Sequence, residues 1–190
     1  RDVDMHRFHV GNGVAYAIPI GDGSRVRGLR ANDVIGDEFA SINKDIFERV
    51  IVGFGAVAND PIGNVVQIAS IAKAKELGMW QDDESDKFLL SMPNQAIISG
   101  TAFYEFNHFA YYWKLWKDII KTNGNIKLMT QLFGDDFDEK TITHKDFAVI
   151  RIPFELIPPG FMDASQVARS KTVHKGMYDM EYGAVFSKDS

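Results

Sequence analysis

Hydrophobic residues occur in short runs along the first part of the chain, a pattern typical of strands. Residues 14–20 form one apolar run, and the glycine-rich residues 21–24 are of the kind that joins two strands. Residues 25–30 are then the expected return strand, and residues 32–36 form another short apolar strand. The pattern predicts a β-hairpin followed by a third strand.

The hydrophobic pattern changes to a helical period in the next segment. Apolar residues recur at helical spacing over residues 42–51, and Ser41 or Asn43 is the expected N-cap of this helix. A second apolar helix is predicted from about residue 65 to residue 77. Gly78 follows it directly, where a helix stop is expected.

The second half of the chain continues the alternation of strands and helices. An acidic loop is expected over residues 81–87, a short buried strand over 94–99, a long aromatic helix over 103–122 and a strand over 147–152. A turn over residues 158–160 is followed by a helix over 163–172, with Asp163 as its cap, and a short amphipathic stretch to Tyr182. Short apolar strands separated by helices indicate an α/β fold with a largely parallel sheet.

Composition narrows the class of protein. The 190 residues are 45% hydrophobic and 25% charged, which excludes a disordered tail. No run of roughly 18 apolar residues occurs, so no membrane partner is expected. The net charge of −5 argues against a whole-surface grip on nucleic acid but leaves room for a local basic channel. The absence of cysteine excludes disulfides, thiolate metal sites and cysteine nucleophiles.

Two adjacent carboxylates, Asp37 and Glu38, follow the strand of residues 32–36. Burying two like charges is costly unless a cation or a reaction needs them, and ligands of open α/β sheets sit outside the carboxyl ends of the strands. The pair is interpreted as a Walker B element, in which Asp37 holds Mg²⁺ and Glu38 activates the attacking water. Taken alone, the pair is a weak signal, and an ordinary strand end that runs into solvent is the favoured explanation.

A second strand end carries hydroxyl groups. Ser99 and Thr101 flank Gly100 after the apolar run of residues 97–98. Beside the first strand end, both side chains would lie near the γ-phosphate of ATP, which they could sense by hydrogen bonding. Thr101 is also a candidate N-cap for the aromatic helix, and the two interpretations are compatible.

The aromatic helix is interpreted as part of the core. Four of its residues recur at helical spacing, which is more typical of a buried stripe than of a base-stacking platform: Phe106, Phe109, Trp113 and Trp116. His108 lies among them and is expected to be a packing histidine rather than a metal ligand.

Basic residues precede the acidic pair. Arg27 is a candidate arginine finger for a neighbouring subunit's nucleotide, and together with Arg25 it could instead touch DNA phosphates. A solvated edge strand explains these arginines at least as well. The sequence has no G-x-x-x-x-G-K-[ST] motif, so it offers the metal-and-water half of an ATPase site without a phosphate-binding loop.

Taken together and in this order, residues 23–39, 97–109, 159–169 and 180–186 resemble the large terminase subunit of tailed bacteriophages. That subunit is the ATPase of the DNA-packaging motor. In the family the Asp-Glu pair is the Walker B motif, which corresponds here to Asp37 and Glu38. The Ser-Gly-Thr segment resembles the coupling motif that links ATP hydrolysis to DNA movement, here Ser99, Gly100 and Thr101.

The resemblance implies a RecA-like P-loop ATPase of the ASCE type, with a mostly parallel sheet and helices on both faces. Residues 1–155 would be the C-terminal part of that ATPase domain, and residues 156–190 a lid-like region leading toward a nuclease domain. The family's Walker A lysine would lie before Arg1 and its endonuclease after the chain. The 190 residues are therefore expected to be a slice of a larger motor that alone hydrolyses ATP poorly or not at all.

The resemblance also implies partners. ATP hydrolysis with Mg²⁺ would drive double-stranded DNA into a procapsid, through a homo-oligomeric ring that docks on the portal protein and works with the small terminase subunit. The expected location is the host cell cytoplasm, not the mature virion. Two alternatives stay open: another P-loop DNA translocase or helicase, and a non-catalytic interaction module derived from such an ATPase. The module would tolerate Asp37→Asn and Glu38→Gln, whereas a motor would stop.

Overall fold

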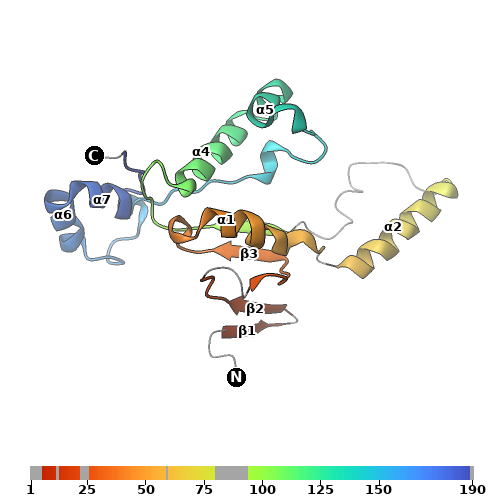
Figure 1. The fold of residues 1–190 in the computed structure, drawn as a ribbon, viewed down its shortest axis with the longest axis horizontal. Helices are drawn as coiled ribbons and strands as arrows, with labels where there is room; N and C mark the ends of the chain where they lie inside the picture. Colours follow the sequence, from red (N-terminus) through yellow and green to blue (C-terminus); the bar gives the residue numbers. More distant parts are fainter. Residues whose placement is uncertain (1–5, 12, 22–25, 59, 80–93, 189–190) are drawn as a thin grey trace. The chain divides into compact units, whose positions relative to one another are not determined.

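The computed structural model describes residues 6–11, 13–21, 26–58, 60–79 and 94–188 (Figure 1). The chain divides into two compact units. The first contains Arg1–Asp37 and Ser41–Ser99, and the second contains Glu38–Ala40 and Gly100–Ser190. The boundary between the units therefore passes through both candidate motifs, between Asp37 and Glu38 and between Ser99 and Gly100.

The first unit contains two small sheets. Strand β1 (His6–Val10) pairs antiparallel with β2 (Gly13–Ala17). Strand β3 (Asp33–Gly36) pairs parallel with β4 (Gln95–Ile98), so that Gly36 lies opposite Ile98. The predicted strands at residues 32–36 and 94–99 are thus confirmed. The strand predicted at residues 14–20 is present in shortened form, but its partner is β1.

The return strand expected over residues 25–30 is wrong for the part of it that the structure describes. Val26 is buried, and the N–H of Leu29 donates to its carbonyl at 3.3 Å to close a turn. Gly28 has a φ of +86°, a conformation that glycine adopts without steric cost and that does not continue a strand. Arg25 and the acidic loop expected over residues 81–87 lie outside the described residues.

The first predicted helix is present, in three consecutive geometries. Helix α1 (Lys44–Ile46) is capped by Asn43, whose Oδ1 accepts from the N–H of Asp45 at 2.9 Å. The chain continues as a π-helix (Phe47–Ile51) and a 3-10 helix (Val52–Ala56). Of the two expected caps, Asn43 is therefore the one used. This segment supplies the buried residues Phe47, Val50, Ile51 and Phe54.

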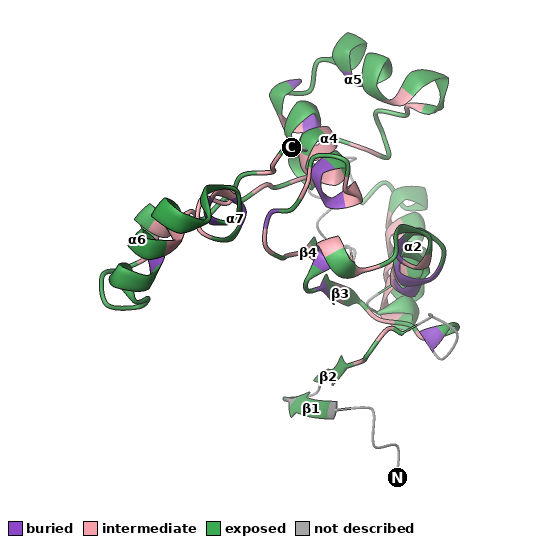
Figure 2. Cartoon of the chain, turned by 60° about the vertical axis from the view of Figure 1, so that its left-hand side comes forward, coloured by how far each residue is buried: buried purple, intermediate pink, exposed green. Residues whose placement is uncertain are grey.

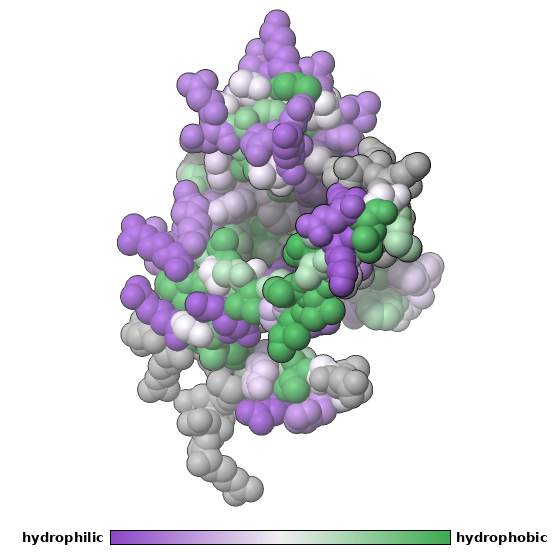
Figure 3. All heavy atoms as spheres, turned by 90° about the vertical axis from the view of Figure 1, so that its right-hand side faces the viewer, coloured by the Kyte–Doolittle hydropathy of each residue, from purple (hydrophilic) through white to green (hydrophobic). Residues whose placement is uncertain are grey.

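Helix α2 (Pro61–Glu76) begins at the cap Asp60, four residues earlier than predicted. It ends before Gly78, where φ is +67°, as predicted. None of its residues is buried. Its apolar side chains are among the most exposed in the first unit, and Ile62 is 78% accessible. Figure 3 shows hydrophobic side chains, in green, lying open on the side of the chain that this view faces.

The second unit is mainly helical. Helix α4 (His108–Lys121) contributes buried Phe109, Ala110 and Ile119, and α5 (Ile126–Phe133), which the sequence reading did not predict, contributes Met129. Helices α6 (Ala164–Val173) and α7 (Lys175–Glu181) correspond to the helix and the amphipathic stretch predicted after Asp163. Buried residues, purple in Figure 2, are few on the helices of this unit.

The strand expected over residues 147–152 is wrong. These residues take no strand conformation, and no described strand lies beside them to complete a ladder. Instead Arg151 anchors the segment to the chain before Val185, with Nε donating to the carbonyl of Ala184 at 2.9 Å and Nη2 to that of Gly183 at 2.6 Å. Residues 147–152 thus have the apolar composition of a strand, but no described strand offers them backbone groups for pairing.

The described residues form a mixed α/β arrangement with one parallel and one antiparallel pair of strands. The largely parallel sheet with helices on both faces that the sequence predicted is not formed by this part of the chain. The strands are also less buried than expected, since Ile35 is 69% and Ile97 is 50% exposed. No helix in the described ranges has the length and apolarity needed to cross a membrane.

The cap of α6 gives a pH-dependent contribution to stability. Asp163 Oδ1 accepts from the Ser165 hydroxyl at 2.6 Å and from the backbone N–H groups of Ser165 at 2.9 Å and Gln166 at 3.2 Å. These hydrogen bonds, the Ser165 hydroxyl foremost, hold the pKa of the Asp163 carboxyl below its ordinary value of 3.8. The stabilisation is thus complete above the unfolded-state pKa and is lost as the pH falls through the folded-state pKa.

We expect Asp163→Asn to keep the cap at pH 7, because the amide oxygen also accepts hydrogen bonds at an N-cap. Below about pH 4 the wild-type carboxylate loses its advantage over asparagine as it is protonated. Urea denaturation of both proteins from pH 7 to pH 3 measures the difference. The effect is small because the side chain is exposed, and a difference in unfolding free energy that did not change with pH would contradict the assignment.

Candidate functional site

In the first unit the candidate site begins where β3 and β4 end. Asp37 follows β3 and Ser99 follows β4. The backbone N–H of Ser99 donates to the carbonyl of Gly36 at 2.9 Å, which extends the ladder by one residue. The Ser99 hydroxyl then donates to Asp37 Oδ1 at 3.0 Å. The expectation that the two strand ends lie side by side is therefore confirmed.

The start of β4 is held by an asparagine that the sequence reading did not single out. Asn94 Nδ2 donates to the carbonyls of Gly55 at 2.7 Å and Val57 at 2.6 Å, at the end of the 3-10 helix. The N–H of Gln95 donates to the carbonyl of Asn32 at 3.2 Å. These bonds fix the register of the parallel pair, and with it the approach of Ser99 to Asp37.

In the second unit the backbone after Asp37 is unusual. Glu38 has a φ of +48°, in the left-handed region that non-glycine residues rarely adopt. Gly100, with a φ of +153°, passes close to it. A Cβ at position 100 would lie 3.1 Å from the nitrogen of Phe39 and 3.3 Å from the Cα of Glu38. Only glycine allows the two segments to approach at backbone distance.

The residue after Glu38 is the most enclosed aromatic side chain of the second unit. Phe39 is 0% exposed, and its ring forms T-shaped pairs with His108, Phe109 and Tyr112 at centroid distances of 4.8, 5.6 and 5.7 Å. Together with Ala40 and Ser41 it forms a 3-10 turn. Burial of Phe39 thus anchors the turn that carries Glu38 to the beginning of α4.

Two polar side chains at the beginning of α4, its N-cap and its first residue, reinforce this anchor. His108 Nε2 lies 3.0 Å from the carbonyl oxygen of Phe39, and Asn107 Nδ2 donates to the carbonyl of Ala40 at 3.0 Å. Because a carbonyl only accepts, His108 must donate from Nε2. His108 is half-buried, and these contacts confirm that it is a packing histidine.

The sequence placed the start of α4 too early. Asn107 Oδ1 accepts from the N–H of Phe109 at 2.8 Å, so Asn107 is the cap and the expected cap Thr101 is wrong. Phe106 therefore precedes the helix and is 71% exposed, contrary to its assignment to the core. Phe109 is buried as expected, while Trp113 and Trp116 are half-buried.

The sequence argument for a bound cation rested on burial of Asp37 and Glu38, and the structure does not show that burial. Asp37 and Glu38 are both exposed, so burial of like charges does not call for a metal ion. The described residues contain no group of three or more His, Cys, Asp or Glu side chains that could hold one. Mg²⁺ in nucleotide sites, however, keeps several waters and needs only one or two carboxylates beside the phosphates. The hard oxygens of Asp37 and Ser99 fit that smaller requirement.

Arg27 lies on the turn after Val26 and is exposed. It is therefore not on the strand that was expected to carry it. An exposed guanidinium can reach a phosphate or a carboxylate of another molecule, and nothing in the first unit assigns Arg27 to a particular one.

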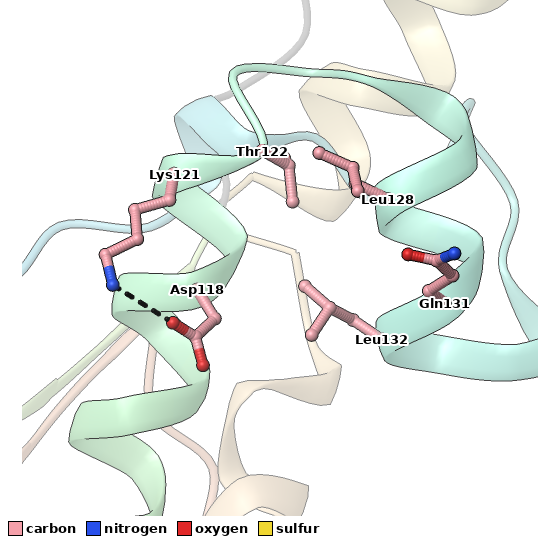
Figure 4. A pocket seen from close by; sticks show the side chains of 6 residues that line it. All are labelled: Asp118, Lys121, Thr122, Leu128, Gln131 and Leu132. Carbon is pink, nitrogen blue, oxygen red and sulfur yellow. Dashed lines mark hydrogen bonds and ion pairs between the residues drawn. The ribbon is translucent and has the colours of Figure 1, made fainter.

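A hollow of about 180 Å³ lies between α4 and α5, and none of the candidate site residues lines it (Figure 4). Its walls are Asp118, Lys121, Thr122, Leu128, Gln131 and Leu132. The two charges face each other, with Lys121 Nζ 3.4 Å from Asp118 Oδ1, and so neutralise one another. The hollow offers neither a free charge nor a reactive group.

Besides Asn94, Phe39 and Asn107 are residues of the site that were not predicted from the sequence. Asn107 had a recognisable signal, because an asparagine before an apolar periodic run is an N-cap signature. For Phe39 the only signal in the sequence is its position directly after the acidic pair.

Comparisons of the chain with models of protein families, with curated proteins and with solved structures find no match.

Proposed function

We propose that this chain is part of the RecA-like ATPase domain of a terminase large subunit, whose ATP hydrolysis drives double-stranded DNA into a procapsid. Residues 1–155 would contribute the ATPase and residues 156–190 the lid-like region. The observation that carries the proposal is the 3.0 Å hydrogen bond from the Ser99 hydroxyl to Asp37 Oδ1, at the shared carboxyl edge of two parallel strands. That edge is where ligands of parallel sheets bind.

The residues divide the work as follows. Mg²⁺-ATP supplies the phosphoanhydride that is cleaved, with the metal neutralising charge on the phosphates. Asp37 Oδ1 is oriented by the Ser99 hydroxyl, which leaves the remaining carboxylate lone pairs for a metal ion. The exposed Glu38 carboxylate accepts a proton from the attacking water. Arg27 is the proposed arginine finger for a neighbouring subunit of the ring.

The phosphate-binding loop of this ATPase has to come from outside these 190 residues, because the sequence holds no such motif. The proposed partners are double-stranded DNA, the portal protein of the procapsid, the small terminase subunit and further copies of the subunit in a ring. The proposed location is the cytoplasm of the infected host. The intact protein would also carry the endonuclease.

The test is ATP hydrolysis by a longer polypeptide that joins an upstream phosphate-binding loop to this chain. We expect Glu38→Gln to lower kcat by about 100-fold or more, since general-base catalysis contributes roughly 10²–10⁴-fold. Asp37→Asn should lower the rate and raise the Mg²⁺ concentration needed. Asp45→Asn, which changes an exposed carboxylate of α1, is the matched control and should leave the rate unchanged.

Turnover that survives Glu38→Gln would overturn the proposed role of Glu38. A longer polypeptide that shows no turnover even with Asp37 and Glu38 in place would favour the non-catalytic interaction module. Turnover coupled to strand separation, rather than to movement along duplex DNA, would favour the helicase alternative. The 190 residues alone are expected to show little or no turnover.

A further inference from the structure

We propose that His108 is a positioning residue for the Glu38 carboxylate. Through its hydrogen bond to the Phe39 carbonyl, the beginning of α4 would impose the backbone conformation from which Glu38 projects. The inference rests on the proposed role of Glu38 as the base that activates water. It assigns to α4 a part in catalysis that the sequence does not indicate.

The first observation is the conformation of Glu38 itself. A φ of +48° in a residue that is neither glycine nor asparagine persists only when the surrounding structure imposes it. Such residues cluster at functional sites, because the strained conformation aims a side chain where a relaxed one would not. The question is then which contacts hold the turn in place.

The second observation answers that question. Two consecutive carbonyls of the turn, those of Phe39 and Ala40, accept hydrogen bonds from two consecutive side chains, His108 and Asn107, each at 3.0 Å. The Phe39 ring is fully enclosed and forms a T-shaped pair with the His108 ring at a centroid distance of 4.8 Å. The segment that contains Gly100 also passes close by, since a Cβ at position 100 would lie 3.3 Å from the Cα of Glu38. The turn is thus clamped between α4 and the segment after β4.

Within this clamp His108 acts on the peptide group between Phe39 and Ala40, one residue beyond Glu38. The Nε2–H of His108 donates to the carbonyl of Phe39, which restricts rotation of the peptide group between Phe39 and Ala40. Without this bond the turn can relax, and Glu38 can return to a negative φ. The carboxylate would then point away from the water it is proposed to activate, while contacts to nucleotide would remain.

Two variants separate the hydrogen bond from ring packing. His108→Phe keeps an aromatic ring against Phe39 and removes the donor, whereas His108→Gln keeps an N–H donor and removes the ring. In the ATP-hydrolysing longer polypeptide we expect His108→Phe to lower kcat by roughly 10- to 100-fold, the cost of a misplacement of about 1 Å. KM should stay within about twofold, and His108→Gln should recover most of the rate. The exposed His174→Phe is the control and should match the wild type.

A readout independent of catalysis is the NMR spectrum of the chain. The coupling between the Glu38 amide and α protons reports φ, and we expect it to change in His108→Phe and to be kept in His108→Gln. The ¹⁵N spectrum of the wild-type imidazole should show a proton on Nε2. A neutral ring protonated on Nδ1 would overturn the inference even if His108→Phe folds poorly, because it cannot donate to the Phe39 carbonyl.

The outcomes distinguish the inference from the function on which it rests. If Glu38→Gln leaves ATP turnover intact, the proposed function fails, while the Glu38 coupling still tests the positioning. If Glu38→Gln abolishes turnover but His108→Phe retains the wild-type rate and coupling, the function stands and the positioning role is refuted.

Discussion

Replacing Phe39 with alanine is expected to lower the free energy of unfolding of the second unit by about 3–5 kcal/mol, the usual range for a buried phenylalanine. The ring is 0% exposed and meets three aromatic neighbours edge-on. Its removal leaves a cavity that His108, Phe109 and Tyr112 cannot fill without leaving their own positions. The turn that carries Glu38 then loses its anchor.

Urea denaturation followed by tryptophan fluorescence measures this loss, because Trp113 and Trp116 both lie on α4. Phe161→Ala is the matched control: the same atoms are removed from a side chain that is 82% exposed, and the change should stay within about 0.5 kcal/mol. Equal costs for the two variants would show that Phe39 is not enclosed as described.

Gly100→Ala is the second substitution with a large expected cost. A φ of +153° is one that side-chain-bearing residues rarely adopt, and forcing such a conformation costs about 1–3 kcal/mol. The new methyl group would also lie 3.1 Å from the nitrogen of Phe39 and 3.3 Å from the Cα of Glu38. Because both are backbone atoms, no rotation of a side chain relieves the contact.

Two other glycines of the second unit separate these contributions. Gly160 has a φ of +87° but open space around it, so Gly160→Ala should cost only the conformational part. Gly176 lies in α7 with a negative φ and open space, and Gly176→Ala should stabilise the unit by about 0.5–1 kcal/mol through helix propensity. A Gly100→Ala protein no less stable than Gly160→Ala would contradict the close approach of the two segments.

Local signals in the sequence were enough to find most elements. The apolar runs at residues 32–36 and 94–99 predicted the two parallel strands. Asp163 was predicted as a cap, and Asn43 was one of two candidates beside Ser41, because such side chains accept backbone hydrogen bonds. Two elements were missed despite available signals. Asn12-Gly13 is a strong hairpin signal between β1 and β2, and Asn125 before Ile126 and Met129 marks the start of α5.

Errors occurred where a partner far along the chain decides the outcome. Residues 147–152 have the composition of a strand, but none of the strands that the structure describes lies beside them, and composition cannot supply a pairing edge. Phe106 fits the helical period of Phe109 and Trp113, yet the cap at Asn107 excludes it from α4. At the candidate site, the neighbourhood of Asp37 and Ser99 followed from parallel strand ends, whereas the left-handed Glu38 and its clamp depend on contacts across roughly seventy positions.

The parallel pairing of β3 and β4 has a consequence for how the chain folds. It joins residues 62 positions apart, as Ser99 is from Asp37. Closing so long a loop loses chain entropy before any strand contact repays it, whereas α4 and α5 form from neighbours a few residues away. We therefore expect the helices to form first and the edge that brings Ser99 to Asp37 to assemble late. The candidate site would be among the last parts of the protein to mature after synthesis.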